Sequence, residues 1–155
     1  MRFVSRMASL QLMIAMLALV VMGSVTVMDV FLKYAFSRPI PGAYDLVESL
    51  LPVVIFNGLP ITLLRRQNIA IDLIDHIAGE RGRRRLITVA DAVMLAMLVL
   101  IVWAMIAPAY QAWEYGDRKL ELGLPVFVIW AGAMTGMAGS VLVAATMLFH
   151  RSAKP

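Results

Sequence analysis

The chain has 155 residues, of which 61% are hydrophobic and 15% are charged, and it contains no cysteine. A soluble chain of this length has too little interior to hide so large an apolar fraction from water. The absence of cysteine excludes disulfides and thiolate metal sites. The formal net charge of +4 fits a membrane protein with basic cytoplasmic loops. We therefore expect a single integral membrane domain over residues 1–155.

Four apolar stretches predict membrane-spanning helices, since a helix needs about 20 apolar residues to cross the hydrocarbon layer. The expected helices cover residues 7–33, 43–64, 86–115 and 122–150. The second stretch is the weakest, because Pro52 and Pro60 lie inside it. Prolines are tolerated in membrane helices where neighbours satisfy the freed carbonyls, so a kinked spanning helix is expected.

The first stretch also resembles a signal peptide, because Arg2 and Arg6 precede its apolar core. Its uncharged core is longer than a typical signal core, however, and no cleavage site of the A-x-A kind ends it. We therefore expect the first helix to be retained.

The distribution of cations predicts the orientation. With the N-terminus inside, ten Lys and Arg residues fall on the inner side and four on the outer side. Short loops rich in Lys and Arg stay in the cytoplasm. The prediction is an all-α membrane protein with four transmembrane helices and with both termini cytoplasmic.

The inner loop between the second and third helices carries a basic, partly apolar segment. Read as a helix over residues 68–79, it places several apolar side chains on one face and carboxylates on the other. This pattern predicts an interfacial amphipathic arm helix that ends near Gly79 and Gly82; a solvated loop with incidental isoleucines is the alternative. Missing aromatics and interspersed carboxylates argue against nucleic acid. The expected lipid contacts are Arg65, Arg66, Ile69, Leu73, Ile74, Ile77, Arg83, Arg84 and Arg85.

Charged residues also gather at the outer ends of the first two helices. Asp29 and Lys33 share a helix face and can pair with each other or contact a partner. Asp45 and Glu48 suit the start of the second helix and could pair with cations of the outer loop. The candidates for partner contact and orientation are Asp29, Lys33, Arg38, Asp45 and Glu48. No nucleophile, metal-ligand set or phosphate loop accompanies them, so we expect no enzyme, metal or cofactor in this chain.

The interior offers packing residues rather than an ion path. Asn57 and Asp91 are the polar residues nearest the bilayer interior, and their roles stay open. The fourth helix repeats small residues at a spacing that lets another helix approach closely. These helix-packing candidates are Gly132, Gly136, Gly139 and Ser140.

Three stretches together resemble the small membrane subunit of tripartite ATP-independent periplasmic (TRAP) transporters. They read VFLKYAFSRPIPGAYDL, FNGLPITLLRRQNIAID and LGLPVFVIWAGAM. In the first, Lys33-Tyr34 stand where Arg-Tyr is usual and Asp45-Leu46 where Glu-Leu is usual. In the second, Asn68 stands at the usual His position. The residues that match there are Gly58, Arg65, Arg66, Ile69 and Asp72.

The resemblance implies a non-catalytic small permease subunit of a sodium-coupled solute importer in a bacterial inner membrane. In that family a large membrane subunit holds the sodium and substrate sites. A periplasmic binding protein delivers the solute, often an organic acid. The small subunit would then scaffold the large one, help dock the binding protein and contact membrane lipids. Sodium is expected in the partner subunit, not in this chain.

Two other functions were weighed against this one. The chain could be the membrane anchor of another inner-membrane complex, although a haem anchor would want paired histidines within its spans. A small exporter acting alone is disfavoured, because neither inverted repeats nor a charged midplane site is present in the sequence.

Overall fold

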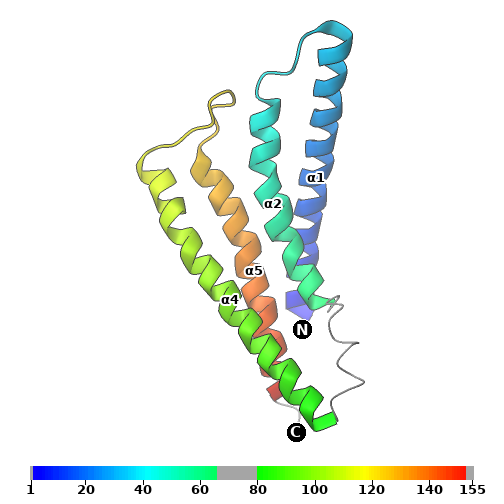
Figure 1. Cartoon of the computed structure of the whole chain (residues 1–155), viewed down its shortest axis with the longest axis vertical. Helices are drawn as coiled ribbons and strands as arrows, with labels where there is room; N and C mark the ends of the chain where they lie inside the picture. Colours follow the sequence, from blue (N-terminus) through cyan, green and yellow to red (C-terminus); the bar gives the residue numbers. More distant parts are fainter. Residues whose placement is uncertain (1, 66–79, 153–155) are drawn as a thin grey trace.

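The computed structural model describes residues 2–65 and 80–152, which form four long helices (Figure 1). All four are long and apolar enough to cross a membrane. The expectation of an all-helical protein with four spanning helices is therefore confirmed. The helices are α1 (Arg2–Phe36), α2 (Ala43–Leu64), α4 (Glu80–Glu114) and α5 (Val126–Ser152).

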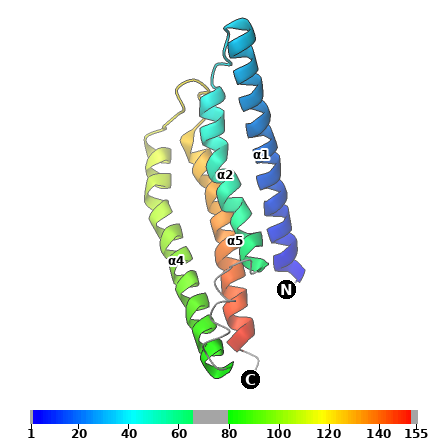
Figure 2. The same ribbon diagram turned by 45° about the vertical axis from the view of Figure 1, so that its right-hand side comes forward.

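The helices follow one another across the bundle in the order α1, α2, α5, α4. Helix α2 packs against both α1 and α5, and α4 packs against α5. Both ends of the chain lie at one end of the bundle, and the α1–α2 and α4–α5 loops lie at the other, here named the loop end (Figures 1 and 2). At the loop end α1 reaches further than the other helices (Figure 1).

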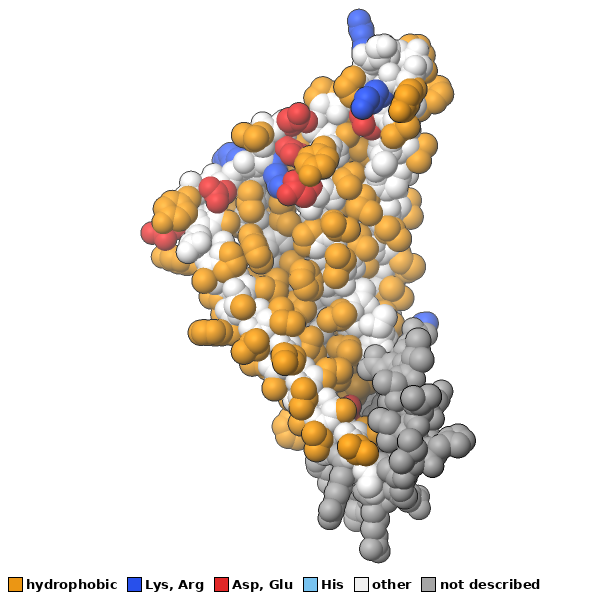
Figure 3. Space-filling view, in the orientation of Figure 1, with side chains coloured by type: hydrophobic (Ala, Val, Ile, Leu, Met, Phe, Trp, Pro, Cys, Tyr) orange, Lys and Arg blue, Asp and Glu red, His pale blue; other side chains and the backbone are white. Residues whose placement is uncertain are grey.

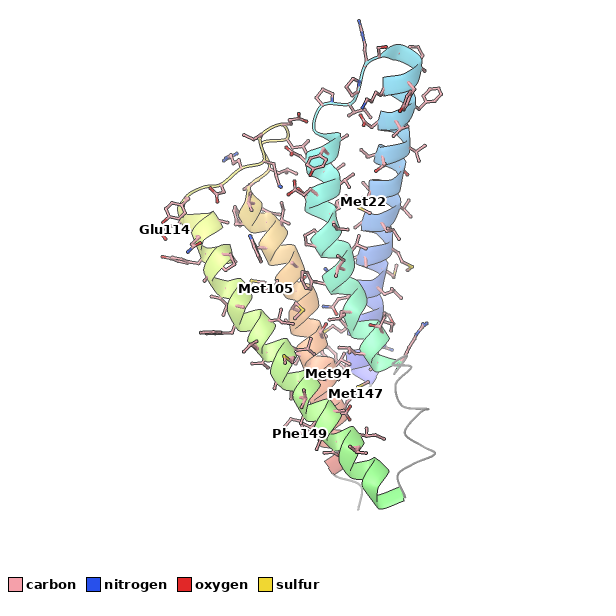
Figure 4. The ribbon with its side chains drawn as sticks, in the orientation of Figure 1. Met22, Met94, Met105, Glu114, Met147 and Phe149 are labelled. Carbon is pink, nitrogen blue, oxygen red and sulfur yellow. The ribbon has the colours of Figure 1, made fainter. Side chains whose placement is uncertain are left out.

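The core lies between α4 and α5, with α2 beside it. Leu98 and Met105 of α4 pack with Ala133, Met137 and Ala144 of α5. Figure 4 shows Met94 and Met105 along α4. Most other large apolar side chains are exposed, and they cover much of the visible surface (Figure 3). Such a surface suits hydrocarbon, where exposed apolar side chains carry no penalty.

Three of the four helices begin elsewhere than the sequence predicted. Helix α1 begins at Arg2 and not at residue 7. Helix α4 begins at Glu80, so Gly82 and residues 83–85 lie inside its first turns and not ahead of it. Helix α5 begins at Val126 and not at residue 122. Gly123 has a φ of 64°, a left-handed conformation that interrupts helical structure. Pro125 follows and directly precedes the first residue of α5, and proline is common at the start of helices.

The expected arm helix over residues 68–79 lies outside the described residues. So do five of the expected lipid contacts: Arg66, Ile69, Leu73, Ile74 and Ile77. Arg65 is described, exposed, and follows α2 with its backbone N–H donating to the carbonyl of Ile61 at 3.0 Å. For Arg83, Arg84 and Arg85 only the helical backbone is described.

Candidate functional site

The glycines of α5 lie where other helices come closest, and we call the line from Gly132 to Gly139 the glycine seam. A Cβ on Gly136 would overlap the backbone carbonyl of Phe56 and lie 2.6 Å from the backbone nitrogen of Asn57. One turn earlier, a Cβ on Gly132 would lie 3.1 Å from Cγ2 of Val53. Backbone therefore meets backbone between α2 and α5, an approach that only small residues permit.

A proline on α2 explains why the contact falls at this level. Pro60 is fully buried and lacks an N–H, so it leaves the carbonyl of Phe56, four residues earlier, without its usual helical donor. The Cα of Gly136 faces the peptide group between Phe56 and Asn57, which contains that carbonyl. The proline of one helix and the glycine of the other thus form a matched pair inside the membrane-spanning region.

Two buried amides bridge helices along the same seam. The Nδ2 group of Asn57, which is 1% exposed, donates to the carbonyls of Val53 and Gly132, each at 3.0 Å. The Nε2 group of Gln11 donates from α1 to the carbonyl of Thr135 at 2.8 Å. The amide of Gln11 also fills the space where Gly139 would carry a Cβ. Asn57 and Gln11 therefore link α2 and α1 to one helix, α5.

Both amide oxygens, Oδ1 of Asn57 and Oε1 of Gln11, are buried without a hydrogen-bond donor among the described residues. Ser140, also buried, donates to the carbonyl of Gly136 in its own helix at 3.0 Å. The sequence reading missed Gln11. Its signal was present, because a lone amide inside an uncharged apolar run is a typical interhelical bridge.

At the loop end, Asp45 fastens the α4–α5 loop to the start of α2. Its Oδ2 accepts hydrogen bonds from the backbone N–H groups of Glu121 at 2.8 Å and Leu122 at 3.3 Å. In return, Oε2 of Glu121 accepts the N–H of Gly42 at 2.6 Å. Each carboxylate therefore holds the other segment's backbone, and we call this reciprocal pair the clasp.

An ion pair lies beside the clasp. The Nζ atom of Lys119 is 2.7 Å from Oε2 of Glu48, whose side chain is 50% exposed, so the pair contributes little to stability. The sequence left open a pairing of Asp45 and Glu48 with Lys33 or Arg38. The structure instead gives them partners on the α4–α5 loop, because the start of α2 faces that loop.

The remaining charged candidates lie at the tip of α1, apart from the clasp. Oδ1 of Asp29 accepts the backbone N–H of Ile40 at 2.6 Å and so holds the returning α1–α2 loop. Lys33 and Arg38 are both exposed there. The five candidates therefore fall into two groups, one at the clasp and one at the α1 tip.

The described interior holds few polar side chains. Among the side chains described, the buried polar ones are Gln11, Asp45, Ser49, Asn57 and Ser140. Asp45 alone among these five is ionisable, and it lies in the first turn of α2. Asp91 is only partly buried, on α4. No cluster of metal-ligating side chains occurs in residues 2–65 and 80–152.

Comparison with known proteins gives the family. No curated protein matches the chain. A family model described as "Tripartite ATP-independent periplasmic transporters, DctQ component" matches residues 22–154. That range contains the C-terminal part of α1, the glycine seam and the clasp. The chain therefore belongs to the DctQ family, the small membrane subunit of TRAP transporters.

Proposed function

We propose that this chain is a static scaffold of a sodium-coupled TRAP importer in a bacterial inner membrane. The large membrane subunit would bind sodium and an organic anion, and a soluble periplasmic receptor would deliver the anion. The chain itself carries out no chemistry and moves no solute. The chain's family consists of transporter components and not of enzymes, which supports the part of this proposal that makes the chain a TRAP transporter subunit.

The observation that carries the scaffold role is the glycine seam. Carriers that alternate between two states need a polar site near the midplane and elements that move around it. Here backbone contact and two amide bridges join α5 to α2 and α1 over the same stretch. Below the clasp, the described residues include no fully buried ionisable side chain, and Asp91 of α4 is only partly buried. Such a body is suited to support a moving partner.

The proposal is tested by reconstitution. Proteoliposomes that contain the purified chain alone should show no solute uptake above that of empty vesicles, with or without a sodium gradient. Adding the co-expressed large subunit and the soluble receptor should restore uptake, and omitting this chain should abolish it. Uptake by the chain alone would overturn the scaffold role.

We also infer that the loop end faces the periplasm, because the cations concentrate on the opposite side. The chain has no native cysteine, so single cysteines report accessibility cleanly. Ser37→Cys, in the α1–α2 loop, should react in intact cells with a thiol reagent that cannot cross the membrane. Gly82→Cys, near the start of α4, should react only after the membrane is permeabilised. The opposite labelling pattern would invert the orientation.

A further inference from the structure

The α4–α5 loop is built as a fixed hairpin, here defined as residues 117–126. Lys119 N–H donates to the carbonyl of Leu124 at 2.9 Å, and Gly123 N–H donates to the carbonyl of Lys119 at 2.8 Å. Val126 N–H closes the base on the carbonyl of Asp117 at 2.9 Å. The clasp then fastens this hairpin to α2. The loop is therefore held both by hydrogen bonds within the hairpin and by the clasp to α2.

One apolar side chain stands out from this fixed hairpin. Leu120 is 100% exposed, although its neighbours in the turn are tied by hydrogen bonds. A large apolar side chain on an ordered backbone loses little conformational entropy when it enters a pocket. Such a side chain can enter an apolar pocket of a partner without reordering of its own backbone.

Charge around Leu120 indicates what could cover it. Residues 43–48 and 114–126 hold five carboxylates against two cations, a net charge of −3. The carboxylates lie around the hairpin and the start of α2 (Figure 3). The two cations are engaged locally, Lys119 with Glu48 and Arg118 with the carbonyl of Gly123 at 3.3 Å. The surface offered to a partner is therefore an apolar knob within a negative field.

A lipid surface does not suit this arrangement. Bacterial membranes carry anionic lipids, which repel a patch of net negative charge and attract clusters of Lys and Arg. The complement is instead a protein face with an apolar hollow bordered by Lys and Arg. Beside the knob lies an open depression of about 660 Å³, lined by four carboxylates and two cations. Its net charge is therefore negative, and it leaves room for a basic side chain of the partner.

We propose that the Leu120 hairpin docks the soluble solute receptor of the same transporter, through an apolar hollow with a basic rim on that receptor. The inference rests on the proposed function, since it places the receptor on the side where the hairpin lies. The inference adds Leu120, which is not among the five charged residues that the sequence offered for partner contact. The clasp then acts as the support that holds the knob in its docking position.

The test measures receptor binding by the chain together with its large subunit in lipid nanodiscs. The probe is the purified solute receptor encoded with this chain, read out by biolayer interferometry. Leu120→Asp should weaken binding about tenfold or more. Asp117→Lys should also weaken binding and reduce its dependence on salt. Ser37→Asp, which adds a charge to the other loop of the same end, should bind like the wild type.

Each outcome decides the inference separately from the scaffold role. Because Leu120 touches nothing in the fold, its variant should keep the wild-type melting temperature and the wild-type yield of complex. Unchanged binding by Leu120→Asp, or no receptor binding by the wild-type complex, would overturn the docking role. If Leu120→Asp changed how firmly the complex stays in lipid vesicles but left receptor binding unchanged, Leu120 would contact lipid, and the docking role would again be wrong. Failure of the scaffold role shows differently, as uptake that does not require this chain.

Discussion

Gly136→Ala should lower the free energy of unfolding of the purified chain by about 1–3 kcal/mol, the usual effect of adding atoms to a packed interior. The new Cβ would overlap the backbone carbonyl of Phe56, and backbone cannot move aside as a flexible side chain can. Helices α2 and α5 must separate or slide, which also strains the bridge between Asn57 and the carbonyl of Gly132. Denaturation in mixed micelles, followed by circular dichroism, measures the change.

Gly58→Ala is the matched control on α2. A Cβ there meets nothing within 4 Å, so the variant should be neutral or stabilised by up to about 1 kcal/mol through lower backbone entropy. If the two alanine variants were equally stable, α2 and α5 would not touch at Gly136. The proposed pairing of Pro60 with Gly136 would then be wrong.

Asp45→Ala should release the hairpin. The substitution removes the acceptor for two backbone N–H groups, and each lost hydrogen bond to a charged group costs about 1.5–3 kcal/mol. We expect amide exchange at Glu121 and Leu122 to accelerate about tenfold to a hundredfold, while amides in the centre of α5 keep their protection. Hydrogen–deuterium exchange with mass spectrometry reads both regions in one experiment.

Glu48→Gln separates the clasp from the neighbouring ion pair. Because the Glu48 carboxylate is half exposed, breaking its pair with Lys119 should change stability by less than about 1 kcal/mol. Hairpin exchange should therefore remain near the wild-type rate. Equal acceleration in the two variants would mean that the ion pair, and not Asp45, holds the hairpin.

The four spans could be predicted because bilayer thickness imposes a length on any apolar helix, whatever its partners. The small residues of α5 were likewise visible as a packing face. Their partner was not, because the spacing of Gly132 and Gly136 says only that some helix approaches closely. The structure identifies that helix as α2, at the carbonyl that Pro60 leaves without a donor.

The clasp and the amide bridges could not be predicted, because they join residues far apart in the chain. Asp45 and Glu121 are 76 positions apart, and Gln11 and Thr135 are 124 apart. Local rules connect Asp45 only with its own helix start, where it does lie, or with the nearby α1–α2 loop. The backbone N–H groups that its carboxylate accepts come instead from the distant α4–α5 loop. The hairpin was missed for a related reason: residues 122–125 look apolar enough to continue α5, and only Gly123 and Pro125 argue against it.

The central claim, that this chain stays rigid while its partner transports, is tested by locking α2 to α5. A Cβ on Gly132 would lie 3.1 Å from Cγ2 of Val53, close to the roughly 3 Å that a disulfide sets between one Cβ and the opposite sulfur. The double variant Val53→Cys/Gly132→Cys should therefore cross-link on oxidation in this otherwise cysteine-free chain. With the two single variants as controls, solute uptake by the oxidised complex should stay within about twofold of its reduced rate, a small change in free energy. Loss of uptake on oxidation, restored by reduction, would show that these helices move during transport and would contradict the scaffold role.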